Sequence, residues 1–134
     1  MLNHSSTFIT TLSENYNPTL SGELNADNNT IYFTPQTITG DGTTTLDLRR
    51  GNKINFTFGE QNETFVFTDP GGACNITIKL EQDAVAGGRT ITWPGSITWL
   101  NDTAPTLLTA TGATDIVTLY YDGSNYWGSY GAFV

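Results

Sequence analysis

The feature that most constrains the fold is a two-residue alternation of apolar and polar side chains that recurs from Gly40 onward. It is clearest in residues 53–58, 64–68 and 74–80, where every second residue is apolar. This period is that of a β-strand with one buried face and one solvent-facing face. No window repeats apolar residues at helical spacing for three turns. The pattern therefore predicts half-buried strands and no long helix.

Turns rich in Gly, Asn and Pro divide these segments into eight or nine short strands. We predict strands at residues 44–48, 53–58, 64–68, 74–80, 90–93, 96–99, 106–109, 115–121 and 125–130. Short strands at this spacing are typical of a sandwich or barrel. Because the alternation is clean, two antiparallel sheets packed face to face fit best. The predicted fold is an all-β, antiparallel β-sandwich, jelly-roll-like, with an immunoglobulin-like sandwich as the alternative.

Residues 1–39 differ from the rest, because they are rich in Asn, Ser and Thr and their apolar residues are irregularly spaced. Pro18 and Pro35 also interrupt strand pairing there. We predict an extended N-terminal arm over residues 1–39 and a β-sandwich domain over residues 40–134. An arm without its own core must lie on its own domain or on a neighbouring subunit. Its predicted contact residues are Phe8, Ile9, Leu12, Tyr16 and Leu20.

Composition and charge exclude several classes of partner. The chain has 134 residues, enough for one domain, and 24 of them are threonine. Thirteen acids against five bases give a net charge of −8. Because so few cations are available for phosphate groups, we predict no nucleic-acid partner and no anionic membrane partner. The first 20 residues show neither the basic start nor the apolar run of a signal peptide, and no stretch has the length of a membrane span.

The titratable residues do not form a recognisable catalytic or metal-binding motif. A glycosidase needs two carboxylates facing each other across about 5–10 Å, and sequence cannot show such facing. The carboxylates considered for such a pair are Glu60, Glu63, Asp102 and Asp115. His4 lacks triad partners, and Cys74 begins an apolar strand face, as a buried structural cysteine would. The oxygen-rich turns at residues 27–29 and 122–125 lack the spacing of a helix-loop-helix calcium site. We predict no enzyme, no cofactor and no metal site.

Aromatic residues crowd the last third of the chain, and two interpretations stay open. In the favoured one, Trp93 and Trp99 fill the core and the C-terminal tyrosines line a subunit interface. In the other, exposed rings form a platform that stacks on sugar rings. The candidate receptor- or glycan-contact residues are Tyr120, Tyr121, Asp122, Asn125, Tyr126 and Trp127.

A series of spaced motifs runs from residue 22 to the end of the chain. The motifs are GELNADNNTI at 22–31, GDGTTTLD at 40–47, GNKI at 51–54, LEQD at 80–83, GRTITWP at 88–94, APTL at 104–107, DIVT at 115–118 and YDGSNYW at 121–127. Together they resemble a module common in virion proteins of tailed phages, especially aquatic ones. The resemblance implies a β-sandwich, usually trimeric, exposed on a virus particle and without catalytic residues.

The resemblance points to two roles, because such modules occur at fibre tips and in small capsid decoration, or cement, proteins. Only a short arm precedes the module in this sequence, whereas a fibre protein has a shaft. We therefore predict a homotrimeric capsid decoration protein on the outer capsid surface of the virion, with itself and the major capsid protein as partners. The alternative is the receptor- or glycan-binding tip of a tail fibre or head fibre, with a host-surface glycan as partner.

Overall fold

The computed structural model describes residues 21–133 and divides the chain into two units, Met1–Ile31 and Tyr32–Val134. In the first unit, the backbone N–H of Asn29 donates to the carbonyl of Ala26 over 2.9 Å and closes a turn. Residues 21–35 contain neither helix nor strand. The five arm residues predicted as contacts lie outside the described residues.

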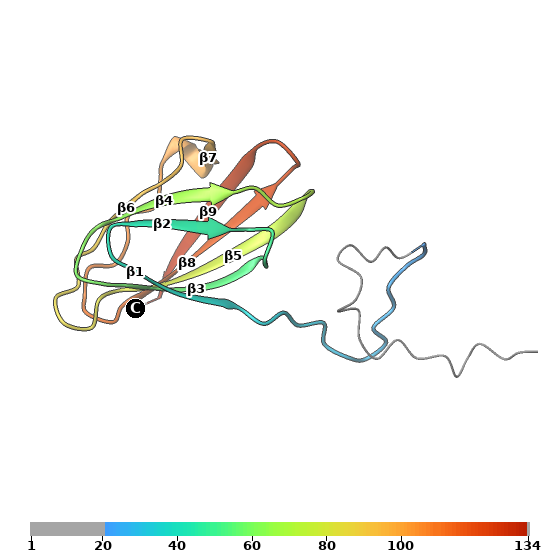
Figure 1. Cartoon of the computed structure of the whole chain (residues 1–134), viewed down its shortest axis with the longest axis horizontal. Coiled ribbons are helices and arrows are strands. Elements are labelled where there is room, and N and C mark those ends of the chain that lie inside the picture. The colour runs from blue at the N-terminus through green and yellow to red at the C-terminus, as the bar shows by residue number, and fades with distance from the viewer. Residues whose placement is uncertain (1–20, 134) are drawn as a thin grey trace, which may run out of the picture. The chain divides into compact units, whose positions relative to one another are not determined.

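The second unit contains two sheets, so the predicted all-β sandwich is confirmed (Figure 1). The strands are β1 (Gln36–Gly40), β2 (Thr43–Asp47), β3 (Lys53–Phe58), β4 (Glu63–Thr68), β5 (Cys74–Glu81), β6 (Ile91–Thr92), β7 (Ile97–Trp99), β8 (Thr114–Tyr121) and β9 (Tyr126–Phe133). A short 3-10 turn, η2 (Leu100–Asp102), follows β7. The larger sheet has the order β1-β3-β5-β8-β9-β7, and the smaller sheet has the order β2-β4-β6.

The pairing differs from the antiparallel, jelly-roll-like pairing that the sequence suggested. From β1 to β6 the chain alternates between the sheets, so that β1, β3 and β5 pair in parallel, as do β2, β4 and β6. Only the β5–β8 and β8–β9 pairs among the described strands are antiparallel. The alternation of apolar and polar residues shows which face of a strand is buried. The pattern is the same whether the strand runs parallel or antiparallel to its neighbour. Parallel neighbours need a crossover, and here a strand of the opposite sheet provides it.

Because its strands alternate between the two sheets, we call the segment from β1 to β6 the β1–β6 coil. Backbone hydrogen bonds between its successive turns stabilise it at one edge. Gly59 N–H donates to the Gly40 carbonyl over 2.7 Å, and Thr64 N–H donates to the Gly42 carbonyl over the same distance. A Cβ atom at Gly40 would overlap the ring of Phe56 and the carboxylate of Glu63. Position 40 therefore requires glycine because neighbouring side chains lie directly against its backbone.

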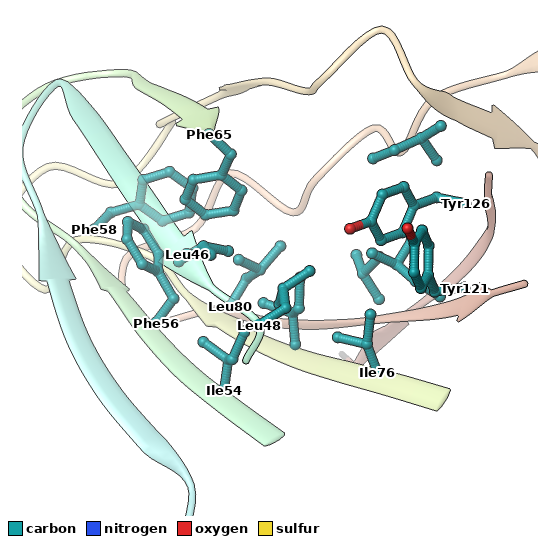
Figure 2. Close-up of a cluster of buried hydrophobic side chains, with 14 residues drawn as sticks. Leu46, Leu48, Ile54, Phe56, Phe58, Phe65, Ile76, Leu80, Tyr121 and Tyr126 are labelled. Atoms are coloured by element: carbon teal, nitrogen blue, oxygen red, sulfur yellow. The ribbon is translucent and has the colours of Figure 1, made fainter. Parts of the chain in front are cut away.

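The core lies between the two sheets and has two ends. Figure 2 shows Phe56, Phe58 and Phe65 gathered at one end, with Tyr121 and Tyr126 at the other and aliphatic side chains between them. The phenylalanines meet edge to face: the centroid of the Phe56 ring lies 5.2 Å from that of Phe58 and 4.8 Å from that of Phe65. Such aromatic pairs stabilise a core beyond the area that they bury.

The structure tests three local predictions: the position of two tryptophans, the strand at residues 106–109 and the start of the β-domain. Trp93 and Trp99 pack against the core, with their ring centroids 5.1 Å apart, which confirms their predicted inward position. Residues 106–109 form no strand, contrary to prediction; Leu107 nevertheless packs against the core. The larger sheet begins at Gln36 in β1, four residues before the expected start of the β-domain.

Candidate functional site

Two aromatic side chains lie next to each other on the outer face of the larger sheet. Tyr120 of β8 and Trp127 of β9 are directly paired across the hairpin, and they are 49% and 50% exposed. The alternation of β8 explains this, because Leu119 and Tyr121 point into the core and leave Tyr120 outside. An aromatic pair that is half in solvent is a ready surface for a flat apolar ligand face.

This aromatic pair lies within a polar surface made by the neighbouring strands. Tyr120 is paired with Asn75 of β5, and Trp127 with Thr98 of β7. The adjacent row contains Thr77, Thr118 and Ser129, and the hydroxyl oxygens of Thr118 and Ser129 are 2.9 Å apart. We call this surface the Trp127 face; its residues are Asn75, Thr77, Thr98, Thr118, Tyr120, Trp127 and Ser129.

The β8–β9 turn fixes the orientation of the Trp127 indole. Nε1–H of Trp127 donates to Oδ2 of Asp122 over 3.0 Å. Oδ1 of Asp122 accepts the backbone N–H groups of Ser124 and Asn125 over 2.8 and 2.7 Å. The Trp127 bond, followed by these backbone bonds, lowers the pKa of Asp122 to about 2. The ring is therefore held in place by a carboxylate that is ionised at any physiological pH.

Two buried tyrosines support the face from within the core. Tyr121 and Tyr126 are 6% and 2% exposed, and their ring centroids are 4.6 Å apart. The Tyr126 hydroxyl donates to Oδ1 of Asp69 over 2.6 Å, which ties β9 to the turn between β4 and β5. Burial raises the pKa of both phenols, and at Tyr126 the bond to Asp69 raises it further. Neither hydroxyl ionises at neutral pH, so both tyrosines act by packing, and Tyr126 also acts through its hydrogen bond to Asp69.

Three hollows adjoin one another near the β8–β9 hairpin, and two of them are lined by Trp127. One of about 310 Å³ lies between β5, β8 and β9, and its lining includes Asn75, Thr77, Thr118, Tyr120, Trp127 and Ser129. A second, of about 480 Å³, lies on the other side of the indole and is lined by Thr98, Trp99, Leu100, Asn101, Trp127 and Ser129, with Gly128. A third, of about 320 Å³, shares Trp99, Leu100, Asn101, Gly128 and Ser129 with the second. It also reaches Tyr130, which pairs with the buried Val117 and therefore lies on the opposite face of the sheet from Trp127.

The structure separates the six glycan-contact candidates into three positions. Tyr120 and Trp127 are on the outer face, Asp122 and Asn125 form the turn behind the indole, and Tyr121 and Tyr126 are in the core. Sequence reasoning missed the polar residues that surround the aromatic pair. The alternation along the strands predicts that Asn75, Thr77 and Thr118 face solvent. It does not predict which residues lie beside them in the folded sheet.

Two of the other candidate carboxylates, those of Glu63 and Asp115, are buried and accept hydrogen bonds from backbone N–H groups. Glu63 and Asp115 are each 1% exposed; Oε2 of Glu63 accepts the N–H of Gly42, and Oδ2 of Asp115 accepts that of Leu108. Burial raises the pKa of the Asp115 carboxyl and that of the Cys74 thiol. Within residues 21–133, no three His, Cys, Asp or Glu side chains gather as a metal ion would need. The same stretch has no helix with the length and apolarity to cross a bilayer.

Comparison with known proteins gives one family. The family model described as "Putative phage tail fibre C-terminal domain" matches residues 33–126, which include both sheets up to the start of β9. No curated protein and no solved structure matches the chain.

Proposed function

The chain belongs to the family of phage tail fibre C-terminal domains, and on that premise we propose that it binds carbohydrate on the host cell surface through the Trp127 face. The family is one of structural components of the phage virion. Tail fibres make the first contact with a host, so a binding surface at their C-terminal end has a clear use.

The observation that carries this proposal is the fixed, half-exposed indole of Trp127. A side chain in solvent ordinarily loses rotamer freedom when a ligand stacks on it. Here the bond from Nε1 to Asp122 has already restricted the ring, so less entropy is lost on binding. Hydroxyl and amide groups of Asn75, Thr118 and Ser129 surround the aromatic pair and suit sugar hydroxyls.

An array of purified bacterial O-polysaccharides and capsular polysaccharides tests the proposal. We expect the full chain to bind at least one polysaccharide, and Trp127→Ala to weaken that binding tenfold or more. Tyr32→Ala is the matched control, because Tyr32 is an exposed aromatic residue outside the strands; it should bind like the wild type. Binding to no polysaccharide, or equal binding by Trp127→Ala, would overturn the proposal.

The capsid decoration role stays a prediction, as do the homotrimer, the major capsid protein as partner and the outer capsid location. The copy number of the chain in purified particles distinguishes the roles. A number of the same order as the major capsid protein would favour decoration of the shell. A much smaller number would favour a fibre.

A further inference from the structure

We propose that the Trp127 face binds an internal segment of an uncharged polysaccharide, which crosses the strands on both sides of the indole, rather than the end of a chain. This inference rests on the proposed function and specifies the ligand of the same surface. Three observations carry it: the continuity of the hollows, the chemistry of their lining, and the backbone of η2.

The hollows on the two sides of the indole form one path across the outer face. The first two meet at Trp127 and Ser129, and the second and third meet at Leu100 and Asn101. Each alone is at the lower end of the roughly 300–1,000 Å³ typical of small-molecule sites. A single sugar unit would fill only one of them. A chain of several units would use the first two, which lie on either side of the indole, and would pass over it.

Beyond the first hollow, the outer face of the larger sheet continues from β5 to β3. Thr77, which lines the first hollow, is paired with Lys53 of β3, and Lys53 is exposed on the same outer face. Its amino group donates to Thr77 Oγ1 over 3.2 Å and lies along the sheet surface. The exposed outer side chains of β3 give a polymer a surface on which to continue, whereas recognition of a chain end needs a closing wall.

The lining of the path favours an uncharged ligand. Among the described residues that line the three hollows, none carries a formal charge. The nearest fixed charge behind the indole is the carboxylate of Asp122, and the whole chain carries −8. The Lys53 ammonium at Thr77 is a local exception at the β5 end of the path. The excess of carboxylates over the whole chain nevertheless repels an anionic glycan and so discriminates against it.

The backbone of η2 presents a polar group at the junction of two hollows. Asn101 and Asp102 are consecutive non-glycine residues with positive φ, at 59° and 54°. Such conformations are uncommon outside glycine and concentrate at functional sites. Asn101 lines both the second and the third hollow, where its amide can both donate to and accept from sugar hydroxyls.

A length series tests the inference. The probe is the O-polysaccharide that the array retains most tightly, cut by dilute acid and fractionated into fragments of one to eight sugar units. We expect the affinity, measured by calorimetry, to rise at least tenfold between one and four units and then to level off. Reducing the terminal sugar of an eight-unit fragment to an alditol should leave its affinity unchanged.

Variants on opposite sides of the indole complete the test. Tyr120→Ala alters the first hollow, and Asn101→Gly removes the amide at the other side while glycine keeps the positive φ. Each should weaken binding of a six-unit fragment at least threefold. Val66→Ala, an exposed site on the smaller sheet, is the control and should not change the affinity.

The outcomes separate this inference from the proposed function. Equal affinity for one and six units, or loss of binding on terminal reduction, would overturn the internal-segment inference and leave carbohydrate binding intact. A retained polysaccharide whose carboxylate or phosphate groups are needed for binding would overturn the uncharged-ligand part. If no array polysaccharide binds, the proposed function fails and the inference fails with it.

Discussion

The β1–β6 coil and the β8–β9 hairpin use aromatic side chains in different ways. In the coil, Phe56 and Phe65 are each at most 2% exposed and pack edge to face between the sheets (Figure 2). In the hairpin, Tyr126 is buried in the core while Tyr120 and Trp127 are about half exposed. The solvent-facing side chains of β3 and β5 are polar, so these two strands of the coil present no aromatic ring to a ligand. The exposed aromatic rings proposed for recognition are therefore confined to the hairpin, whereas β5 of the coil adds only polar side chains to the same face.

Removing a coil phenylalanine should have the largest effect and should leave recognition intact. Phe56→Ala deletes a ring that contacts Phe58 and Phe65, and a truncation of this kind in a core destabilises a protein by about 3–5 kcal/mol. Urea unfolding followed by circular dichroism measures the loss. While the variant is folded, its polysaccharide affinity should equal that of the wild type.

The control for this experiment is Val66→Ala on the outer face of the smaller sheet, because Val66 is 46% exposed. Its free energy of unfolding should stay within about 0.5 kcal/mol of the wild type, as for most surface substitutions. A folded Phe56→Ala protein with weakened binding would break the proposed separation of the two regions.

Tyr126→Phe tests the link between the regions and should have an intermediate effect. The Tyr126 hydroxyl donates to Asp69 in the turn after β4, so the bond joins the hairpin to the coil. Loss of a hydrogen bond to a charged group destabilises by about 1.5–3 kcal/mol. Urea unfolding should show this loss, while the slope of the free energy of unfolding against urea concentration stays unchanged because the ring remains in the core. A lower slope would instead indicate that the two regions no longer unfold together.

The sequence predicted most strands but not how they pair. Alternation located β3, β4, β5 and β8 to within a residue, since each has a buried face. Pairing direction depends on where the chain returns, and no residue type encodes that in this pattern. β1 was missed because its sequence QTITG has one apolar residue with a large side chain, Ile38. Residues 106–109 (TLLT) combine β-branched and apolar residues as strands do, but they form a segment outside the sheets in which the Leu108 N–H donates to the buried Asp115.

The candidate site was predictable only in part, for a similar reason. Tyr120 and Trp127 stand on either side of the turn signal Asp122–Asn125, so their facing across a hairpin follows from local sequence. Asn75, Asn101 and Ser129 come from separate elements and meet only through the pairing of β5, β8, β9 and the η2 turn. Because the pairing was not predictable, neither were the hollows. Tyr121 and Tyr126 are predicted contact residues, but the structure buries both in the core.

Asp122→Asn should have the smallest effect on stability, and its pH dependence identifies the cause. The folded-state pKa of Asp122 is about 2, below the ordinary value of 3.8, so ionised Asp122 stabilises the fold above pH 3.8. That contribution is lost as the pH falls through 2. Urea unfolding at several pH values should therefore show the wild type more stable than Asp122→Asn at pH 7, with the difference shrinking between pH 4 and pH 2.

Trp127→Phe distinguishes the indole bond from the backbone bonds at the same carboxylate. The Nε1–H donor is the largest cause of the lowered pKa, so its removal should move the pKa of Asp122 upward, as measured by carboxyl carbon chemical shifts in an NMR titration. The backbone bonds from Ser124 and Asn125 should keep the pKa below 3.8. An unchanged pKa would mean that the carboxylate serves the turn alone, so that the hairpin does not orient the ring on which recognition is proposed to depend.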